Sequence, residues 1–254
     1  MRSPLRIAVL ECDTPPDSTN TKYGGYRGVF TSLLKESARA LDQPTRLDPE
    51  TDLEITGWDI VNGEEYPRLE DVDAILMTGS KYNSFEDVPW INRLVEFTRK
   101  AVAHDRVRVL GICFGHQIIG RALGAKVGRS EDGWEIAVCE MDLTAQGSEL
   151  FGLDKIRIQQ MHRDIVYDYP ANVVPLGSSP LCAVQGMYSP GHFVTIQGHP
   201  EFTGDIVSEI VRVRTEAGVF SKEQSADALS RAGRPHDGIA TGVVFLRFLL
   251  EGVE

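Results

Sequence analysis

The stretch VRVLGICFGHQIIG, residues 107–120, decides the fold expected for this chain. Its first half is apolar and rich in β-branched residues, which predicts a buried strand. Its second half predicts a helix over residues 114–123 that ends at a glycine. Gly111 and Gly115 stand two residues on either side of Cys113. This G-x-C-x-G spacing predicts a tight strand-to-helix turn that carries the cysteine, because glycine lets the chain bend sharply and lets other segments pass close by.

Segments of strand length and helix length alternate on both sides of this turn. Such alternation predicts an α/β fold, with a mainly parallel central sheet and helices on both of its faces. No internal repeat and no linker is found, so a single domain over residues 1–254 is expected. In the first half of the chain the expected strands are 5–10, 55–61, 72–77 and 107–111, and the expected helices are 29–40, 90–104 and 114–123.

In the second half of the chain the regular alternation of strands and helices is interrupted. Residues 135–197 contain short strand-like segments separated by Gly and Pro. Residues 205–217 and 243–250 return to helical spacing, and a loop is expected between them, around residues 233–238. Near the N-terminus the polar, glycine-containing residues 17–27 also predict a loop, which we expect to wall the site and influence its specificity.

The composition is typical of a globular protein. Of the 254 residues, 42% are hydrophobic and 25% are charged. The net charge of -11 argues against binding to nucleic acid or to an anionic membrane. No stretch has the roughly 18 apolar residues of a membrane span, and no signal peptide is recognised. The scattered cysteines indicate reduced thiols, so a cytoplasmic protein is expected.

No metal and no cofactor is expected. The cysteines and histidines lack the spacing of metal ligands. Neither a G-x-G-x-x-G segment between a strand and a helix nor a P-loop occurs in the sequence.

Cys113 is the candidate nucleophile. The expected turn places its sulfur at a helix N-terminus, where the helix dipole favours the thiolate. The thiolate is the form that attacks a carbonyl carbon. The alternative is a buried structural cysteine, since free cysteine is among the most buried residue types.

His199 and Glu201 are the candidates for a general base and for the residue that orients it. They stand two residues apart in GHPEF, residues 198–202, directly after the strand-like run FVTIQ, residues 193–197. A catalytic thiol needs an imidazole within reach, and the imidazole needs an acceptor that selects its tautomer. The alternative is a surface turn with a solvated histidine and glutamate.

Together, the segments GICFGHQ (residues 111–117) and GHPEF (residues 198–202) resemble the two sequence elements of the class I, or triad, glutamine amidotransferase family. The resemblance implies the flavodoxin-like α/β fold of that family and attack on the γ-carboxamide of a glutamyl group. It further implies that Cys113 forms a γ-glutamyl thioester, that His199 transfers the proton, and that Glu201 orients and stabilises His199.

The same resemblance implies roles for further residues. Backbone N–H groups of Gly79 and Phe114 would form the oxyanion hole. Gln117 would help to hold the glutamyl group. A loop that would bind the α-amino and α-carboxylate groups of the substrate includes Met161, His162 and Arg163.

Three functions stay open at this point. The first is a stand-alone hydrolase of γ-glutamyl amide bonds in a small molecule, namely glutamine, a γ-glutamyl peptide or a glutathione conjugate. Residues 78–87 and 89–91 look like those of stand-alone cytosolic γ-glutamyl peptidases, and the chain is too short to include a synthetase domain. The second is a glutaminase subunit that supplies ammonia to a separate synthetase partner. The third is a non-catalytic regulatory protein on the same fold.

Overall fold

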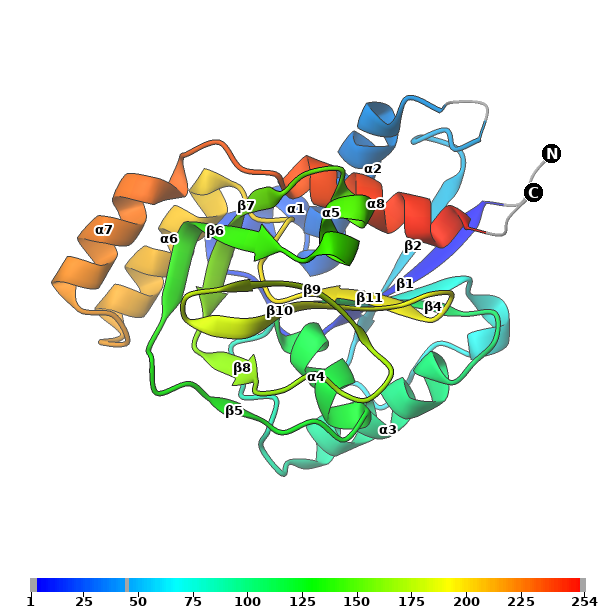
Figure 1. Ribbon diagram of the computed structural model, residues 1–254, viewed down its shortest axis with the longest axis horizontal. Helices are drawn as coiled ribbons and strands as arrows, with labels where there is room; N and C mark the ends of the chain where they lie inside the picture. The colour runs from blue at the N-terminus through cyan, green and yellow to red at the C-terminus, as the bar shows by residue number, and fades with distance from the viewer. Residues whose placement is uncertain (1–3, 44–45, 252–254) are drawn as a thin grey trace.

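A central sheet of nine strands organises the chain, whose computed structural model describes residues 4–43 and 46–251. The strands are β1 (Leu5–Glu11), β2 (Leu53–Asp59), β3 (Ala74–Met77), β4 (Arg108–Ile112), β5 (Val127–Arg129), β6 (Glu135–Leu143), β7 (Lys155–His162), β8 (Asp164–Val166), β9 (Val174–Ser179), β10 (Cys182–Ser189) and β11 (Phe193–Ile196). Their order in the central sheet is β2-β1-β3-β4-β11-β10-β9-β6-β7, and β5 pairs with β8 separately (Figure 1).

The central sheet has a parallel part and an antiparallel part. Strand β1 pairs in parallel with β2 and β3, β3 with β4, and β4 with β11. From β11 onward, neighbouring strands run antiparallel. The α/β fold expected from the sequence is confirmed, and the short segments of residues 135–197 extend one edge of the parallel strands.

Helices cover both faces of this sheet (Figure 1). Helices α2 and α8 pack on each other above the sheet in this view, and α3 and α4 lie below it. Helices α6 and α7 pack together at the end of the sheet where β6 and β7 lie. The helices are α1 (Asp17–Tyr23), α2 (Tyr26–Leu41), α3 (Pro89–Val102), α4 (Phe114–Ala122), α5 (Ala145–Phe151), α6 (Gly204–Glu216), α7 (Lys222–Ala232) and α8 (Gly238–Leu250).

Side chains of the parallel strands alternate between two cores. Leu76 and Leu110 join the core with α2 and α8, whereas Ile75 and Val109 join the core with α3 and α4. All four side chains are buried. Strands covered on both faces are apolar along their whole length, which explains why the parallel strands are continuous apolar runs in the sequence.

Residues 17–27 do not form the expected loop, because helix α1 and the start of α2 occupy most of this segment. The α1 sequence DSTNTKY lacks an apolar repeat, so its spacing contains no helical signal. A distant residue stabilises this helix instead. The carboxylate of Glu209 in α6 accepts hydrogen bonds from the backbone N–H groups of Ser18 and Thr19, which are unpaired within the helix itself.

The C-terminal part contains more helix than expected. Helix α7 is not predicted from the spacing, and α8 begins at Gly238 rather than at residue 243. A capping box opens α7: the Ser221 hydroxyl accepts from the Gln224 backbone N–H, and the Gln224 side chain accepts from the Ser221 backbone N–H. This S-x-x-Q spacing is a local signal that could have located the helix.

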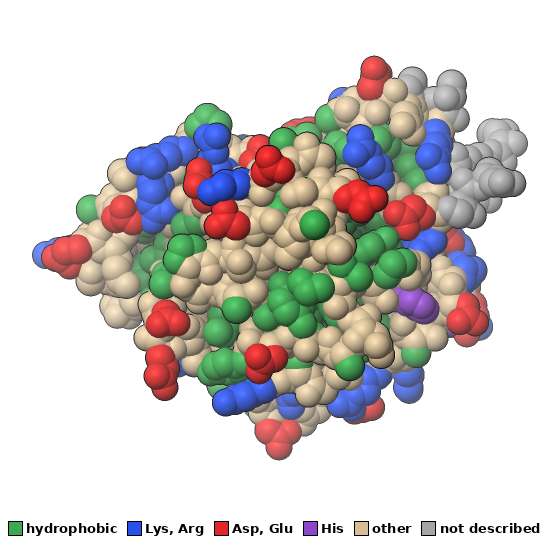
Figure 2. All heavy atoms as spheres, viewed as in Figure 1, with side chains coloured by type: hydrophobic (Ala, Val, Ile, Leu, Met, Phe, Trp, Pro, Cys, Tyr) green, Lys and Arg blue, Asp and Glu red, His purple; other side chains and the backbone are tan. Residues whose placement is uncertain are grey.

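The surface charges are mixed in sign. On the face shown in Figure 2, Lys and Arg side chains are interspersed with Asp and Glu around the edge. No helix within residues 4–43 and 46–251 is both long enough and apolar enough to cross a membrane.

Candidate active site

Cys113 occupies the turn between β4 and α4 with an unusual backbone conformation. Its φ and ψ are 50° and -99°, a positive φ that costs free energy in a residue with a side chain. Hydrogen bonds hold this conformation on both sides. The Cys113 N–H donates to the carbonyl of Ile196 at 2.9 Å, and its carbonyl accepts from the N–H of Gln117 at 3.1 Å. The turn is therefore anchored to β11 and to the first turn of α4.

The two glycines around Cys113 are required by close packing. A Cβ at Gly115 would lie 2.6 Å from both the Cβ and the carbonyl oxygen of Met77. A Cβ at Gly111 would lie 2.9 Å from the carbonyl oxygen of Gly115. Any larger residue would push the start of α4 away from β3 and β4, so the G-x-C-x-G spacing follows from the contact between these elements.

His199 and Glu201 form a buried pair in the turn after β11. The His199 Nδ1 lies 2.8 Å from a carboxylate oxygen of Glu201, and both side chains are almost fully shielded from solvent. The His199 backbone N–H donates to the carbonyl of Gln159 in β7 at 2.7 Å. The ring of Phe202 stacks on the imidazole, with centroids 4.0 Å apart. The imidazole is thus held by a carboxylate at one edge and by an aromatic ring on one face.

The surroundings of His199 favour its charged form. Burial lowers the pKa of the imidazole, but the negative charges of Cys113 and Glu201, and hydrogen bonds to both, raise it overall to about 10. The interaction with Cys113 places the imidazole beside the sulfur. A cationic imidazole next to a thiolate is the state in which a cysteine nucleophile is ready to react.

Gly79 contacts the same imidazole. A Cβ at Gly79 would lie 2.6 Å from Cε1 of His199, so only glycine fits here. The Thr78 hydroxyl accepts from the Cys12 N–H at 3.0 Å and donates to the Gly79 carbonyl at 2.9 Å, which holds the turn after β3. Phe114 follows Cys113 directly and begins α4. Gly79 and Phe114, the expected oxyanion-hole residues, therefore both lie at the site, Gly79 against His199 and Phe114 next to Cys113.

The side chain of Gln117 is held in place by three hydrogen bonds. Its amide nitrogen donates to the carbonyl of Asp164 at 2.8 Å and to the side chain of Gln197 at 3.0 Å. Its amide oxygen accepts from the hydroxyl of Ser84 at 2.8 Å. Both amide N–H groups are thereby used, and the oxygen keeps one lone pair that can accept a hydrogen bond from a ligand.

Met161, His162 and Arg163 lie where β7 ends, beside this glutamine and Cys113. The ring of His162 is buried, with its Nε2 3.0 Å from a carboxylate oxygen of Glu135 in β6. The same carboxylate oxygen accepts from the side chain of Gln185 at 2.7 Å. Sequence reasoning did not identify Glu135, because no motif links β6 to the end of β7.

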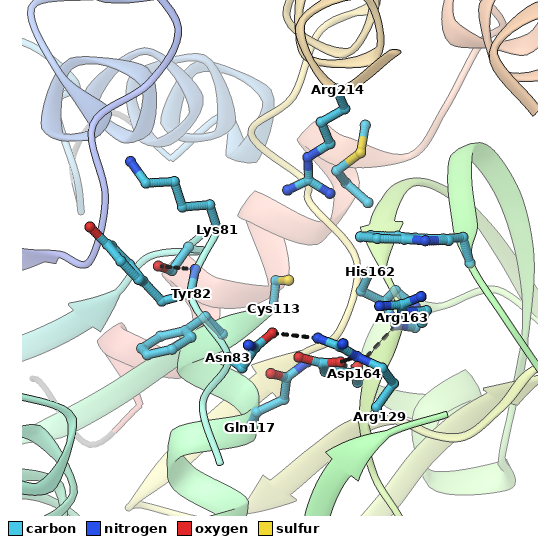
Figure 3. Close-up of a pocket in the computed structure, with 14 residues that line it drawn as sticks. Lys81, Tyr82, Asn83, Cys113, Gln117, Arg129, His162, Arg163, Asp164 and Arg214 are labelled. Carbon is cyan, nitrogen blue, oxygen red and sulfur yellow. Dashed lines mark hydrogen bonds and ion pairs between the residues drawn. The ribbon is translucent and has the colours of Figure 1, made fainter. Parts of the chain in front are cut away.

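The site contains two adjoining spaces, and Figure 3 shows the one that Cys113 lines. The smaller has a volume of about 50 Å³ and is lined by Cys113, Gln117 and His162. The larger has a volume of about 640 Å³, passes His199 and continues between α1 and α6. Both are lined by Lys81 and Asn83, from the segment 78–87. Both are also lined by Arg129, Trp134 and Arg214, which no motif singled out.

The four cysteines are all free thiols. Within residues 4–43 and 46–251, no group of three or more His, Cys, Asp or Glu side chains is arranged to hold a metal ion. The groups that line the site are the thiol, the imidazole, the carboxylate and the surrounding hydrogen-bond donors.

Comparison with known proteins assigns this site to a family. Residues 28–210 match the family Glutamine amidotransferase class-I. A putative glutamine amidotransferase-like protein of Schizosaccharomyces pombe is 34% identical over 250 residues, which cover 96% of this chain and 98% of that protein. γ-Glutamyl peptidase 4 of Arabidopsis thaliana is 34% identical over 223 residues, covering 84% of this chain and 82% of the relative. The chain belongs to the class I glutamine amidotransferase family.

Solved structures agree on the fold. A glutamine amidotransferase from Thermotoga maritima superposes with a TM-score of 0.72 at 18% identity, covering 98% of this chain and 99% of the other. A glutamine amidotransferase from Methylobacillus flagellatus superposes with a TM-score of 0.71 at 20% identity, covering 100% of this chain and 96% of the other. The relatives named γ-glutamyl peptidase support an amidohydrolase activity within this family.

Proposed function

We propose that this chain is a stand-alone hydrolase that cleaves γ-glutamyl amide bonds in small molecules, with Cys113 as nucleophile, His199 as acid and base, and Glu201 as the residue that orients His199. The single observation that supports a stand-alone peptidase best is the cleft of about 640 Å³ on the His199 side of Cys113. An enzyme that releases only ammonia needs little room there, whereas a peptide leaving group needs a cleft. Relatives named γ-glutamyl peptidase support the same activity.

In the first half of the reaction, the Cys113 thiolate attacks the γ-carbonyl carbon of the substrate. The carbonyl oxygen becomes negatively charged and accepts hydrogen bonds from the backbone N–H groups of Gly79 and Phe114. Such donors contribute roughly 10²–10³ in rate. The C–N bond then breaks while the His199 imidazolium gives its proton to the departing nitrogen, and a γ-glutamyl thioester remains on the sulfur.

In the second half, neutral His199 takes a proton from water as the water oxygen attacks the thioester carbon. The C–S bond breaks, glutamate leaves and the thiolate–imidazolium pair is restored. Glu201 keeps the proton of Nδ1 in place throughout, so that Nε2 of His199 performs both transfers.

In this proposal the glutamyl group of the substrate binds in the smaller space. The remaining lone pair of the Gln117 amide oxygen accepts from the substrate α-amino group, and the segment of Met161, His162 and Arg163 surrounds the α-carboxylate. His162 acts here by fixing the end of β7 through Glu135, because its ring nitrogens already face Glu135 and the carbonyl of Asp164.

Glutamate release tests the proposal. Purified protein is incubated with glutamine, glutathione and S-methylglutathione, and glutamate is measured by mass spectrometry. We expect release from the peptides and a loss of at least about 10³-fold in Cys113→Ala. Cys139→Ala is the matched control, because Cys139 is also a free thiol but lies in β6 against Arg231, outside both spaces.

Other outcomes identify the alternatives. If glutamine is the only substrate cleaved, and only after a synthetase is added, the chain is an ammonia-supplying subunit. No glutamate from any substrate, with Cys113 unreactive toward them, indicates a non-catalytic protein on this fold.

A further inference from the structure

Arg214 carries a guanidinium that forms no ion pair with a carboxylate within residues 4–43 and 46–251. It projects from the last turn of α6 into the pocket that contains Cys113 (Figure 3). Its guanidinium carbon lies over two aromatic rings, 5.1 Å from the centre of Trp134 and 5.8 Å from that of Phe220. Its Nη1 is buried and has no hydrogen-bond partner among the described residues. Burial lowers the pKa of this group, since leaving water disfavours its charged form.

Arg163 likewise forms no ion pair with a carboxylate among the described residues. Its guanidinium carbon lies 5.3 Å from the centre of the same Trp134 ring, and its buried Nε also lacks a partner among the described residues. Other arginines have a carboxylate partner, as Arg6 has in Asp73 at 2.7 Å and Arg129 in Asp164 at 3.2 Å. In a chain with a net charge of -11, two half-buried arginines beside the nucleophile thus each have a buried nitrogen and no ion-pair partner among the described residues.

Buried polar groups in proteins are nearly always satisfied, and a buried charge is paired. The missing partner of each guanidinium is therefore expected to be an anion that enters the cleft. A guanidinium held flat on an aromatic ring presents its free N–H groups along its edge, which suits the two oxygens of a carboxylate.

The position of Arg214 assigns it to one side of the scissile bond. His199 protonates the departing nitrogen, so the amine half of the substrate must lie on the His199 side of Cys113. The space on that side is the larger cleft. Both Arg214 and Arg163 reach both spaces, but Val213 and Val219, close to Arg214 in the chain, line only the larger cleft. The neighbours of Arg163 in the chain, His162 and Asp164, line only the smaller space, so Arg163 is assigned to the glutamyl half.

We propose that Arg214, supported by Trp134, binds a carboxylate on the amine half of the substrate, so that the enzyme selects γ-glutamyl amino acids and peptides over glutamine and over neutral γ-glutamyl amides. This inference rests on the proposed function. A γ-glutamyl peptide carries one carboxylate on each side of the γ-amide bond, and the cleft offers one unpaired guanidinium for each. Glutamine supplies only the first of these carboxylates.

The test compares two substrates that differ in one group: S-methylglutathione and the same compound with its glycine carboxylate converted to a carboxamide. We expect the wild-type enzyme to prefer the carboxylate at least tenfold in kcat/KM, mainly through KM, since a hydrogen bond to a charged group contributes about that factor or more. In Arg214→Gln the two substrates should become equivalent within about twofold.

Two further variants test whether the preference depends on the guanidinium of Arg214. Arg212→Gln is the matched control, because Arg212 is exposed on the same helix outside the cleft, and it should keep the full preference. Arg214→Lys keeps the charge but loses the planar group on Trp134, and an intermediate preference is expected.

Each failure has a distinct meaning. Equal cleavage of both substrates by the wild-type enzyme overturns the inference and leaves the proposed function standing, and it needs no variant to fold. A preference that persists in Arg214→Gln overturns the assignment to Arg214. No glutamate release from either substrate overturns the proposed function and this inference together.

Discussion

The carboxylate of Glu209 in α6 lies 2.6 Å from the hydroxyl of Thr19 in α1, a contact between residues 190 positions apart. The same carboxylate accepts from the backbone N–H groups of Ser18 and Thr19. Helix α1 has no apolar face of its own that would hold it in place. One side chain therefore joins the two helices between which the larger cleft runs.

Glu209→Gln should loosen α1 and widen the cleft. We expect a loss of about 1 kcal/mol in the free energy of unfolding, as for loss of a helix cap, and a higher KM for peptide substrates. Urea unfolding and steady-state kinetics measure both. Glu216→Gln, exposed at the end of the same helix, should change neither. Equal behaviour of the two variants would show that the contact does not support the cleft.

The same contact should depend on pH. Burial raises the pKa of Glu209, but its hydrogen bonds to Ser18 and Thr19 outweigh this and lower the pKa below the ordinary value of 4.5. A lowered pKa means that the stabilisation is present above pH 4.5 and is lost as the pH falls through the folded-state pKa. The protection of the α1 amides from hydrogen exchange, relative to the intrinsic exchange rate at each pH, should therefore fall in acid, and this fall should be absent in Glu209→Gln.

Gly79→Ala should impair the reaction without unfolding the protein. The new methyl group would lie 2.6 Å from Cε1 of His199 and would displace the imidazole from the sulfur. A displacement of this kind costs on the order of 10² in rate, so we expect kcat/KM to fall by about that factor. Gly233→Ala is the matched control, because Gly233 has a φ of -89° and nothing within 4 Å of an added Cβ.

The pH dependence of kcat/KM should report the His199 imidazolium. Burial lowers its pKa, but Cys113 and Glu201 raise it to about 10, so activity that requires the protonated ring should decline as the pH rises through that value. Glu201→Gln removes one negative charge and should move this decline to lower pH. Cys113→Ala should also lower the pKa of His199, as followed by NMR. An unchanged imidazole titration in both variants would contradict the coupling.

Glu135→Gln should destabilise the end of β7. The carboxylate faces His162 and accepts from Gln185, and both contacts are buried. Leaving buried polar groups poorly satisfied costs about 1–3 kcal/mol, which urea unfolding measures, and KM should rise because β7 ends beside Cys113. Glu140→Gln, exposed on the same strand, should be neutral. Loss of stability with an unchanged KM would restrict Glu135 to a role in folding.

The positions of Cys113, His199 and Glu201 could be located from the chain alone because each depends on local rules. Glycines are required two residues from Cys113 because the strand-to-helix turn packs too closely against itself and against β3 to leave room for a Cβ. His199 and Glu201 are two residues apart, so their hydrogen bond forms within a single turn. The parallel strands could be recognised for the same reason, since burial on both faces makes each one continuously apolar.

Contacts between distant segments could be decided only by the tertiary structure. Helix α1 depends on Glu209, His162 depends on Glu135, and the two unpaired arginines meet at Trp134. None of these residues stands in a local pattern that differs from ordinary surface or strand sequence. Their roles arise from the packing of β6, β7 and α6 against one another, because side-chain hydrogen bonds and ring contacts act over a few ångströms in space, whatever the separation along the chain.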